Sequence, residues 1–202
     1  MPYFSYSDDE IAALAPKDRK LGAAIARIGR IEREVQPDLF AALIESIIAQ
    51  QISAKAAVTI KRRVSELYGG ITPEAIGALS EAQIQQCGMS HRKAGYVKAA
   101  ANAVLDGSLD LNNLSQIDDE AAIKELVKLP GVGIWTAEML LIFSLQRPNV
   151  FSYGDLAIRR GLCKLHGHKE ITKAQFEKYR KRYAPYQSIA SLYLWHIAGE
   201  SD

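Results

Sequence analysis

The chain has 202 residues, of which 48% are hydrophobic and 24% are charged. This composition is typical of a globular protein with a buried core and excludes a disordered or fibrous chain. A net charge of +2 neither requires nor excludes a polyanionic partner. The two cysteines, Cys87 and Cys163, are too few for a four-thiolate zinc site or an iron–sulfur cluster, and we expect both to be buried free thiols.

No run of about 18 uncharged apolar residues occurs, so the sequence predicts no transmembrane helix and no membrane partner. The first ten residues also lack the basic and then apolar layout of a secretory signal. We therefore expect a cytoplasmic protein, or a nuclear one in a eukaryotic host.

Apolar residues recur at steps of three and four almost throughout the chain, which predicts helices, and no stretch alternates strictly enough to predict a strand. About a dozen helices with short links indicate an all-α fold. Capping and terminating residues place the main helices, in chain order, after Pro37, from Ser53 to Gly69, from Thr72, from Ser80 to Cys87, from Ser90 to about Leu105, from Asp118 or Asp119 to Leu129, from Ile134 to Leu145, and from Asp155, Thr172 and Pro185.

The segment from Leu129 to Ala137, with the sequence LPGVGIWTA, lies between two of these helices. Gly131 and Gly133 allow backbone conformations that a side chain would hinder, and the turn leads directly into a helix N-terminus. Amide groups at such a position can bind a phosphate without reading the base sequence. A plain helical hairpin with a glycine turn explains the same pattern.

Asp155 follows this hairpin and stands before an apolar helical repeat. The simplest interpretation is an N-cap, which satisfies a free amide group of the first helical turn. A carboxylate at that position also lies at the positive end of the helix dipole, which favours the ionised form needed for electrostatic catalysis. The two roles are compatible.

Taken together, these segments resemble the helix–hairpin–helix DNA glycosylase superfamily, and within it the 3-methyladenine DNA glycosylase II branch, which excises alkylated bases. The match runs from about Phe40 to Gly199. The segments that carry it are Ile48 to Ser53, Gly88 to Ser90 with Lys93 and Ala94, Leu129 to Glu138, Arg147 and Pro148 with Val150 and Phe151, Asp155 to Ala157 with Arg159 to Gly161, and Pro185 and Tyr186 with Ser188 and Tyr193 to Trp195.

The resemblance implies a two-lobed helical fold without the N-terminal β-domain of the bacterial type member. A central bundle would span residues 37–146 and include the hairpin at 129–135. Residues 1–36 and 147–202 would form the second lobe, and the active site would lie in the cleft between the lobes. The family further implies a monomer that needs no cofactor, with a structural monovalent cation held by the backbone carbonyls of Val127, Leu129 and Val132.

The implied activity is hydrolysis of the N-glycosidic bond of a flipped-out alkylated purine in double-stranded DNA, leaving an abasic site. Asp155 would stabilise the cationic sugar and orient or deprotonate the attacking water, while Trp135, Trp195 and Tyr153 would line the base pocket. Bifunctional relatives have a lysine where this chain has Trp135, so we expect no lyase activity. A core position on the last helix would equally explain Trp195.

The resemblance also implies which residues contact DNA. Gln51 is the candidate for the wedge that fills the gap left by the flipped nucleotide, with Ile52 and Ser53 beside it in the minor groove. Backbone groups of the hairpin would bind phosphates, at Gly131, Gly133, Ile134 and Thr136. A polar helix end at Gln50 and Gln51, followed by a capping Ser53, explains the first of these segments without DNA.

Two other functions remain open from the sequence. One is a non-catalytic helix–hairpin–helix module that only recognises damaged or abasic DNA. The other is excision of oxidised or mismatched bases, which are mostly neutral and would need specific hydrogen-bond donors that the sequence does not reveal.

Overall fold

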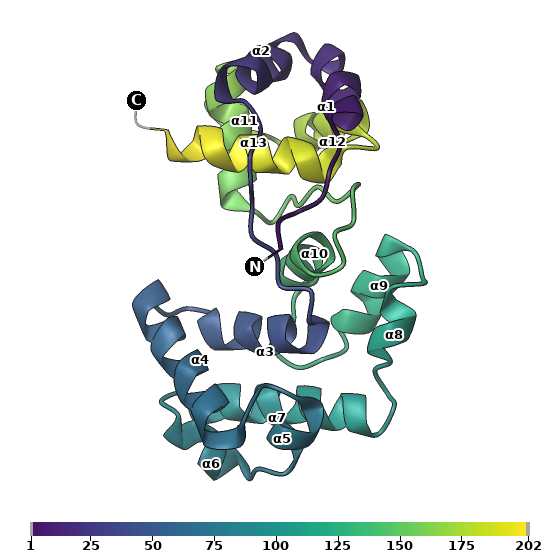
Figure 1. Ribbon diagram of the computed structural model, residues 1–202. Helices are drawn as coiled ribbons and strands as arrows, with labels where there is room; N and C mark the ends of the chain where they lie inside the picture. The colour runs from purple at the N-terminus through teal and green to yellow at the C-terminus, as the bar shows by residue number, and fades with distance from the viewer. Residues whose placement is uncertain (1, 201–202) are drawn as a thin grey trace. The chain divides into compact units, whose positions relative to one another are not determined.

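The computed structural model describes residues 2–200, and these are mainly helical (Figure 1). Within this range the only β contact is an isolated bridge between Tyr3 and Glu34, so the predicted all-α class is confirmed. The elements are α1 (Asp8–Leu14), η1 (Ala15–Lys17), α2 (Arg19–Ile28), α3 (Leu39–Ala49), α4 (Ala54–Tyr68), α5 (Pro73–Gly77), α6 (Glu81–Gln86), α7 (His91–Leu105), α8 (Leu111–Leu114), α9 (Asp119–Leu126), α10 (Ile134–Phe143), α11 (Leu156–His166), α12 (Lys173–Tyr183) and α13 (Gln187–Gly199). None of the helices in the described part of the chain is both long and apolar enough to cross a membrane.

The predicted helix starts are confirmed wherever a capping side chain was identified. In each case the side chain accepts a hydrogen bond from a backbone N–H of the first turn, at Ser53, Thr72, Ser80, Ser90, Asp118, Asp155 and Thr172. Two predicted ends are wrong. α9 stops at Leu126, because Pro130 has no N–H to donate to the Leu126 carbonyl. α10 stops at Phe143, shortly before Gln146 takes a left-handed φ of 51°, a conformation that commonly follows the end of a helix.

The N-terminal helices and the short α8 were not predicted, although the sequence carries a signal for α1. Ser7 and Glu10 form a capping box, in which the Ser7 hydroxyl accepts from the Glu10 N–H and the Glu10 carboxylate accepts from the Ser7 N–H. A serine followed three residues later by glutamate is the pattern of that motif. Asp18 caps α2 through a carboxylate oxygen that accepts the N–H groups of Lys20 and Leu21, without a reciprocal bond.

Both cysteines are free thiols, as predicted. Cys87 is buried, but Cys163 is only half-buried, so the prediction for its burial is wrong. Cys163 follows the fully buried Leu162 on α11, and each residue along a helix turns about 100° away from its neighbour.

The chain divides into two compact units. One spans Gln36–Leu140, and the other comprises the described residues up to Val35 together with those from Leu141 onward, so the second division falls inside α10. The divisions predicted from the sequence fall after residues 36 and 146, which is one residue and six residues beyond the divisions in the structure. In the Gln36–Leu140 unit, α7 packs against α3, α5 and α6.

In the other unit, α11 packs against α13, and α2 contacts both. The two long helices approach closely at Gly161, where an added Cβ would overlap the backbone carbonyl of Leu194. Glycine is therefore required for this helix crossing, which brings the start of α11 and the middle of α13 into contact.

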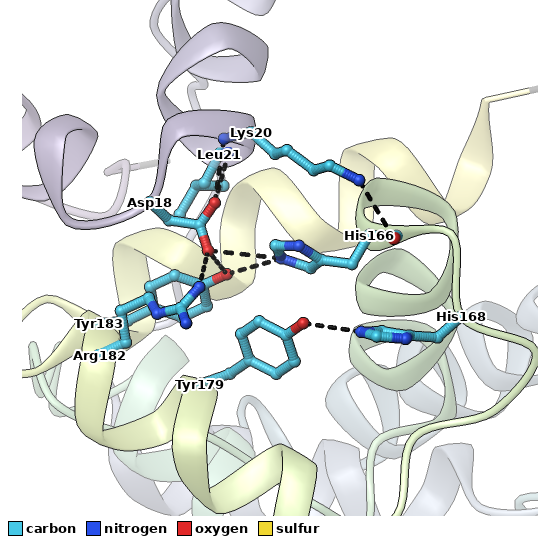
Figure 2. Close-up of polar contacts among 8 residues, drawn as sticks. All are labelled: Asp18, Lys20, Leu21, His166, His168, Tyr179, Arg182 and Tyr183. Carbon is cyan, nitrogen blue, oxygen red and sulfur yellow. Dashed lines mark hydrogen bonds and ion pairs between the residues drawn. The ribbon is translucent and has the colours of Figure 1, made fainter.

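A polar cluster around the buried Asp18, formed with His166, Arg182 and Tyr183, joins α2, α11 and α12 in this same unit (Figure 2). Oδ2 of Asp18 accepts hydrogen bonds from Arg182 Nη1 at 2.6 Å and from the Tyr183 hydroxyl at 3.3 Å. The same oxygen lies 3.5 Å from Nε2 of His166. Since the Asp18 side chain is only 3% exposed, these partners replace water around its charge.

We expect acid to weaken this unit through the cluster. Burial alone would raise the pKa of Asp18, but the hydrogen bonds from Arg182 and Leu21 outweigh it, and the pKa lies below its ordinary value. The pKa of His166 also lies below its ordinary value, because burial lowers it by more than the attraction of Asp18 raises it. For both groups the unfolded state binds protons more readily, so stability falls as the pH drops below about 6.5 for His166 and below about 4 for Asp18.

Asp18→Asn should therefore lower the free energy of unfolding at pH 7 by about 2 kcal/mol, because asparagine keeps the N-cap and loses the charge facing the half-exposed Arg182. Thermal melts followed by circular dichroism between pH 7 and pH 3 measure this. The variant should also lose less stability than the wild type below pH 4. Asp8→Asn, which removes an exposed ion pair with Arg30, should change little. If the melting temperatures of the wild type and Asp18→Asn fell equally between pH 7 and pH 3, the stabilising role given to the Asp18 charge would be contradicted.

Candidate active site

Asp155 is a buried carboxylate at the start of α11. Its Oδ1 accepts the backbone N–H of Ile158 at 2.9 Å, which confirms the predicted N-cap. The same oxygen accepts the indole N–H of Trp195, from α13, at 3.1 Å. Two donors from different helices therefore fix the orientation of this carboxylate. A negative charge held in this way, with 6% of the residue exposed, is suited to electrostatic stabilisation of a nearby cation.

The segment that leads into Asp155 is held by side chains that the sequence reasoning did not identify as site residues. The buried hydroxyl of Ser188 donates a hydrogen bond to the Arg147 carbonyl at 2.6 Å. It also accepts a hydrogen bond from the backbone N–H of Val150 at 3.1 Å. Arg180 donates to the Phe151 carbonyl at 2.8 Å. Ser188 belongs to a segment that carries the family resemblance, and that membership is the signal that could have found it.

Trp195 is half-buried on α13, so it is neither a fully buried core residue nor an exposed one. Its ring packs on Phe143, with the ring centroids 5.4 Å apart, and the guanidinium of Arg33 lies over Phe143 at 5.5 Å. The indole of Trp195 is therefore held by its packing on Phe143 and by its hydrogen bond to Asp155. Phe143 has no capping or motif signal in the sequence.

The ring of Tyr153 contacts Phe176 and Arg159. It makes a T-shaped contact with Phe176, with the ring centroids 5.2 Å apart, and the guanidinium of Arg159 lies over the Tyr153 ring at 5.1 Å. A base that stacked on Tyr153 would have to share the ring with Arg159. Its role in a base pocket stays a prediction.

The hairpin turn needs glycine at only one of its two positions. Gly131 has a φ of +84°, and an added Cβ would overlap the ring of Tyr96. Gly133 has no positive φ, and an added Cβ would meet no atom within 4 Å. The prediction that a side chain would hinder the backbone at both glycines is therefore wrong for Gly133. Its missing side chain leaves open space at the N-terminus of α10 instead.

A cavity of about 510 Å³ brings together two groups of predicted site residues that lie far apart in the sequence. It lies within the Gln36–Leu140 unit, and its wall includes Gln51 from the α3–α4 loop and Gly131, Gly133, Trp135 and Thr136 from the hairpin. Trp135 is 46% exposed, so part of its ring is accessible. Thr136 is buried, with 5% of the residue exposed, so little of it is accessible for the predicted DNA contact.

The remaining residues predicted to contact DNA, Ile52, Ser53 and Ile134, are all exposed. Ile134 is 63% exposed at the start of α10, and Ile52 is 37% exposed on the α3–α4 loop. Ser53 is exposed and caps α4. Ile52 also lines a second cavity, of about 340 Å³, together with Gln50, Gln51, Met89, Ser90 and Lys93.

The residues of the predicted cation site lie in the turn between α9 and α10. Within it, the carbonyl of Leu129 accepts the N–H of Val132 at 3.2 Å, and each carbonyl oxygen can accept more than one partner. Among the described residues, no group of three or more histidine, cysteine, aspartate or glutamate side chains could hold a metal ion. Backbone carbonyls, which suit hard cations, are the donors that this turn offers.

Comparison with known proteins agrees with the geometry. The Schizosaccharomyces pombe DNA-3-methyladenine glycosylase 1 is 34% identical over 165 residues, which cover 79% of this chain and 72% of that protein. A crystal structure of a Bacillus halodurans DNA-3-methyladenine glycosidase matches with a TM-score of 0.89 and 37% identity, covering 98% of this chain and 93% of that one.

An S. pombe 3-methyladenine DNA glycosylase, solved in complex with abasic DNA, matches with a TM-score of 0.80 and 32% identity. This match covers 93% of the present chain and 95% of the other. The family model described as HhH-GPD superfamily base excision DNA repair protein matches residues 44–185. The chain therefore belongs to the HhH-GPD superfamily of base excision DNA repair proteins.

Proposed function

We propose that this protein is a monofunctional DNA glycosylase that excises alkylated purines such as 3-methyladenine from double-stranded DNA and acts as a monomer. The observation that carries the proposal is the buried carboxylate of Asp155, oriented by the Ile158 N–H and the Trp195 indole. The names of the related proteins, which are 3-methyladenine DNA glycosylases, support the choice of substrate.

The chemistry follows from the charge of the substrate. Alkylation gives the purine ring a positive charge, so the base leaves as a neutral molecule when it takes the electron pair of the glycosidic bond. The sugar becomes cationic, and Asp155 stabilises that charge and orients the water that attacks C1′. As its oxygen bonds to C1′, the water gives a proton to the Asp155 carboxylate, which then releases it to solvent. A strong general acid is therefore unnecessary.

The remaining residues bind and hold the substrate in this proposal. Trp135 and Trp195 present electron-rich rings to the cationic base, with Tyr153 as a further aromatic candidate. Gln51 fills the gap in the duplex, with Ile52 and Ser53 beside it. Backbone groups of the hairpin bind phosphate, where Gly133 leaves space for close approach. The reaction needs no cofactor, and a monovalent cation on the carbonyls of Val127, Leu129 and Val132 would stiffen the turn.

A base-release assay tests the proposal directly. Purified protein is incubated with methylated duplex DNA, and free 3-methyladenine is measured by chromatography. We expect release of the base together with abasic sites that alkali converts to strand breaks. A module that only recognises damaged DNA would bind the same duplex without releasing a base, and that result would overturn the proposal. A duplex with 8-oxoguanine tests the alternative of oxidised substrates.

We also expect no strand cleavage in the absence of alkali. The position two residues after Gly133 is Trp135, whose indole has no amine to attack the sugar and form a Schiff base. Treatment of the reacting wild-type protein with borohydride should therefore trap no covalent protein–DNA adduct, as judged on a denaturing gel. A lysine-dependent bifunctional glycosylase serves as the positive control. A trapped adduct would mean that another nucleophile acts.

A further inference from the structure

The loop between α3 and α4 takes a constrained backbone path. α3 ends at Ala49, Gln50 leaves the helical region with a ψ of 130°, and Gln51 has a left-handed φ of 56°. A residue other than glycine holds such a conformation only at a free-energy cost, so its surroundings must impose it. The question is which contacts hold Gln51 in this position.

One contact comes from α7. The ammonium of Lys93 donates to the carbonyl of Ile48 at 2.8 Å and also to the carbonyl of Gln50. The last carbonyls of a helix have no partner within the helix, and they lie at the negative end of its dipole. Lys93 therefore supplies both the hydrogen bonds and the charge that the end of α3 requires. Burial lowers the pKa of Lys93, and the two carbonyls replace the water that its ammonium loses.

The second contact comes from the hairpin. The side-chain amide of Gln50 donates to the carbonyl of Gly131 at 2.9 Å. Gly131 in turn lies against the ring of Tyr96, which is on α7 three residues after Lys93. The α3–α4 loop and the hairpin are thus both supported by α7, and one hydrogen bond joins them to each other.

We propose that Lys93 is a positioning residue that holds the α3–α4 loop, and with it Gln51, in the conformation that inserts into the duplex. This inference rests on the proposed function, since it assigns the insertion of Gln51 to damaged DNA. Lys93 acts through the loop and does not contact the reacting atoms. Its loss should weaken binding wherever a gap in the duplex has to be filled, and leave binding to intact DNA unchanged.

The test compares the affinity of the purified protein for two duplexes, one intact and one with a tetrahydrofuran abasic analogue. Lys93→Met keeps the apolar stem and removes the ammonium. We expect it to lower the preference for the abasic duplex about tenfold, since the loop must then be ordered during binding. Lys93→Arg should restore part of the preference. Lys98→Met is the matched control, because Lys98 is also on α7 and donates to a backbone carbonyl, that of Gly77.

The dependence of affinity on salt separates this role from direct phosphate binding. A lysine that binds a phosphate would, when removed, weaken binding to both duplexes equally and reduce the salt slope by about one. That outcome, or an unchanged preference for the abasic duplex, would overturn the proposal. Gln50→Leu removes the bond to Gly131 and should give the same loss of preference, which keeps the test valid if Lys93→Met does not fold. Wild-type base release is measured separately, so a failure of the proposed catalysis leaves the binding result interpretable.

Discussion

Replacing Asp155 with asparagine should lower the rate of base release about a thousandfold or more, because the substitution removes the charge that stabilises the cationic sugar. The fold should survive. Asparagine is as good an N-cap as aspartate, and its side-chain oxygen can still accept the N–H of Ile158 and the indole N–H of Trp195. The defect should therefore lie in the chemical step.

Single-turnover release of 3-methyladenine from a methylated duplex measures this step, and affinity for an abasic duplex measures binding. We expect binding within about threefold of the wild type, a change that corresponds to less than 1 kcal/mol. Asp118→Asn is the matched control, since Asp118 caps α9 through the same kind of bond, at 2.8 Å. Near-normal release by Asp155→Asn would remove the basis of the proposed mechanism.

The sequence predicts the helices well because their ends are determined locally. A serine, threonine or aspartate that caps the next turn acts within three residues, as Ser53 and Asp155 do. The wrong helix ends have local causes as well. Pro130 cannot donate to the last carbonyl of α9, and Gln146 takes a left-handed φ just after α10.

The contacts that shape the candidate site depend instead on packing between distant segments. Trp195 lies 40 residues after Asp155, and the two meet only because Gly161 allows α13 to pass close to α11. Lys93 similarly reaches the end of α3 from α7. No local pattern predicts which donor will lie within hydrogen-bonding distance of which acceptor across such a crossing. The resemblance to a known family selected these residues, and the structure gives their contacts.

The hydrogen bond from Trp195 to Asp155 leads to the second large effect. Trp195→Phe keeps an aromatic ring against Phe143 and removes the indole N–H. A hydrogen bond to a charged group contributes about 1.5–3 kcal/mol, so the single-turnover rate of base release should fall roughly 10- to 100-fold. Affinity for the abasic duplex should change little. If Trp195 acted only by stacking on the base, the phenylalanine variant would keep most of the rate.

A double-mutant cycle distinguishes orientation of the carboxylate from a general loss of packing. If Trp195 acts through Asp155, then Trp195→Phe should hardly lower the rate of base release further in the Asp155→Asn background, because the charge that Trp195 orients is already absent. If the ring position matters by itself, the two losses should add. The rates of the wild type, both single variants and the double variant on one methylated duplex decide between these outcomes. Additive losses would assign Trp195 to the base pocket alone and leave the orientation of Asp155 to the Ile158 N–H.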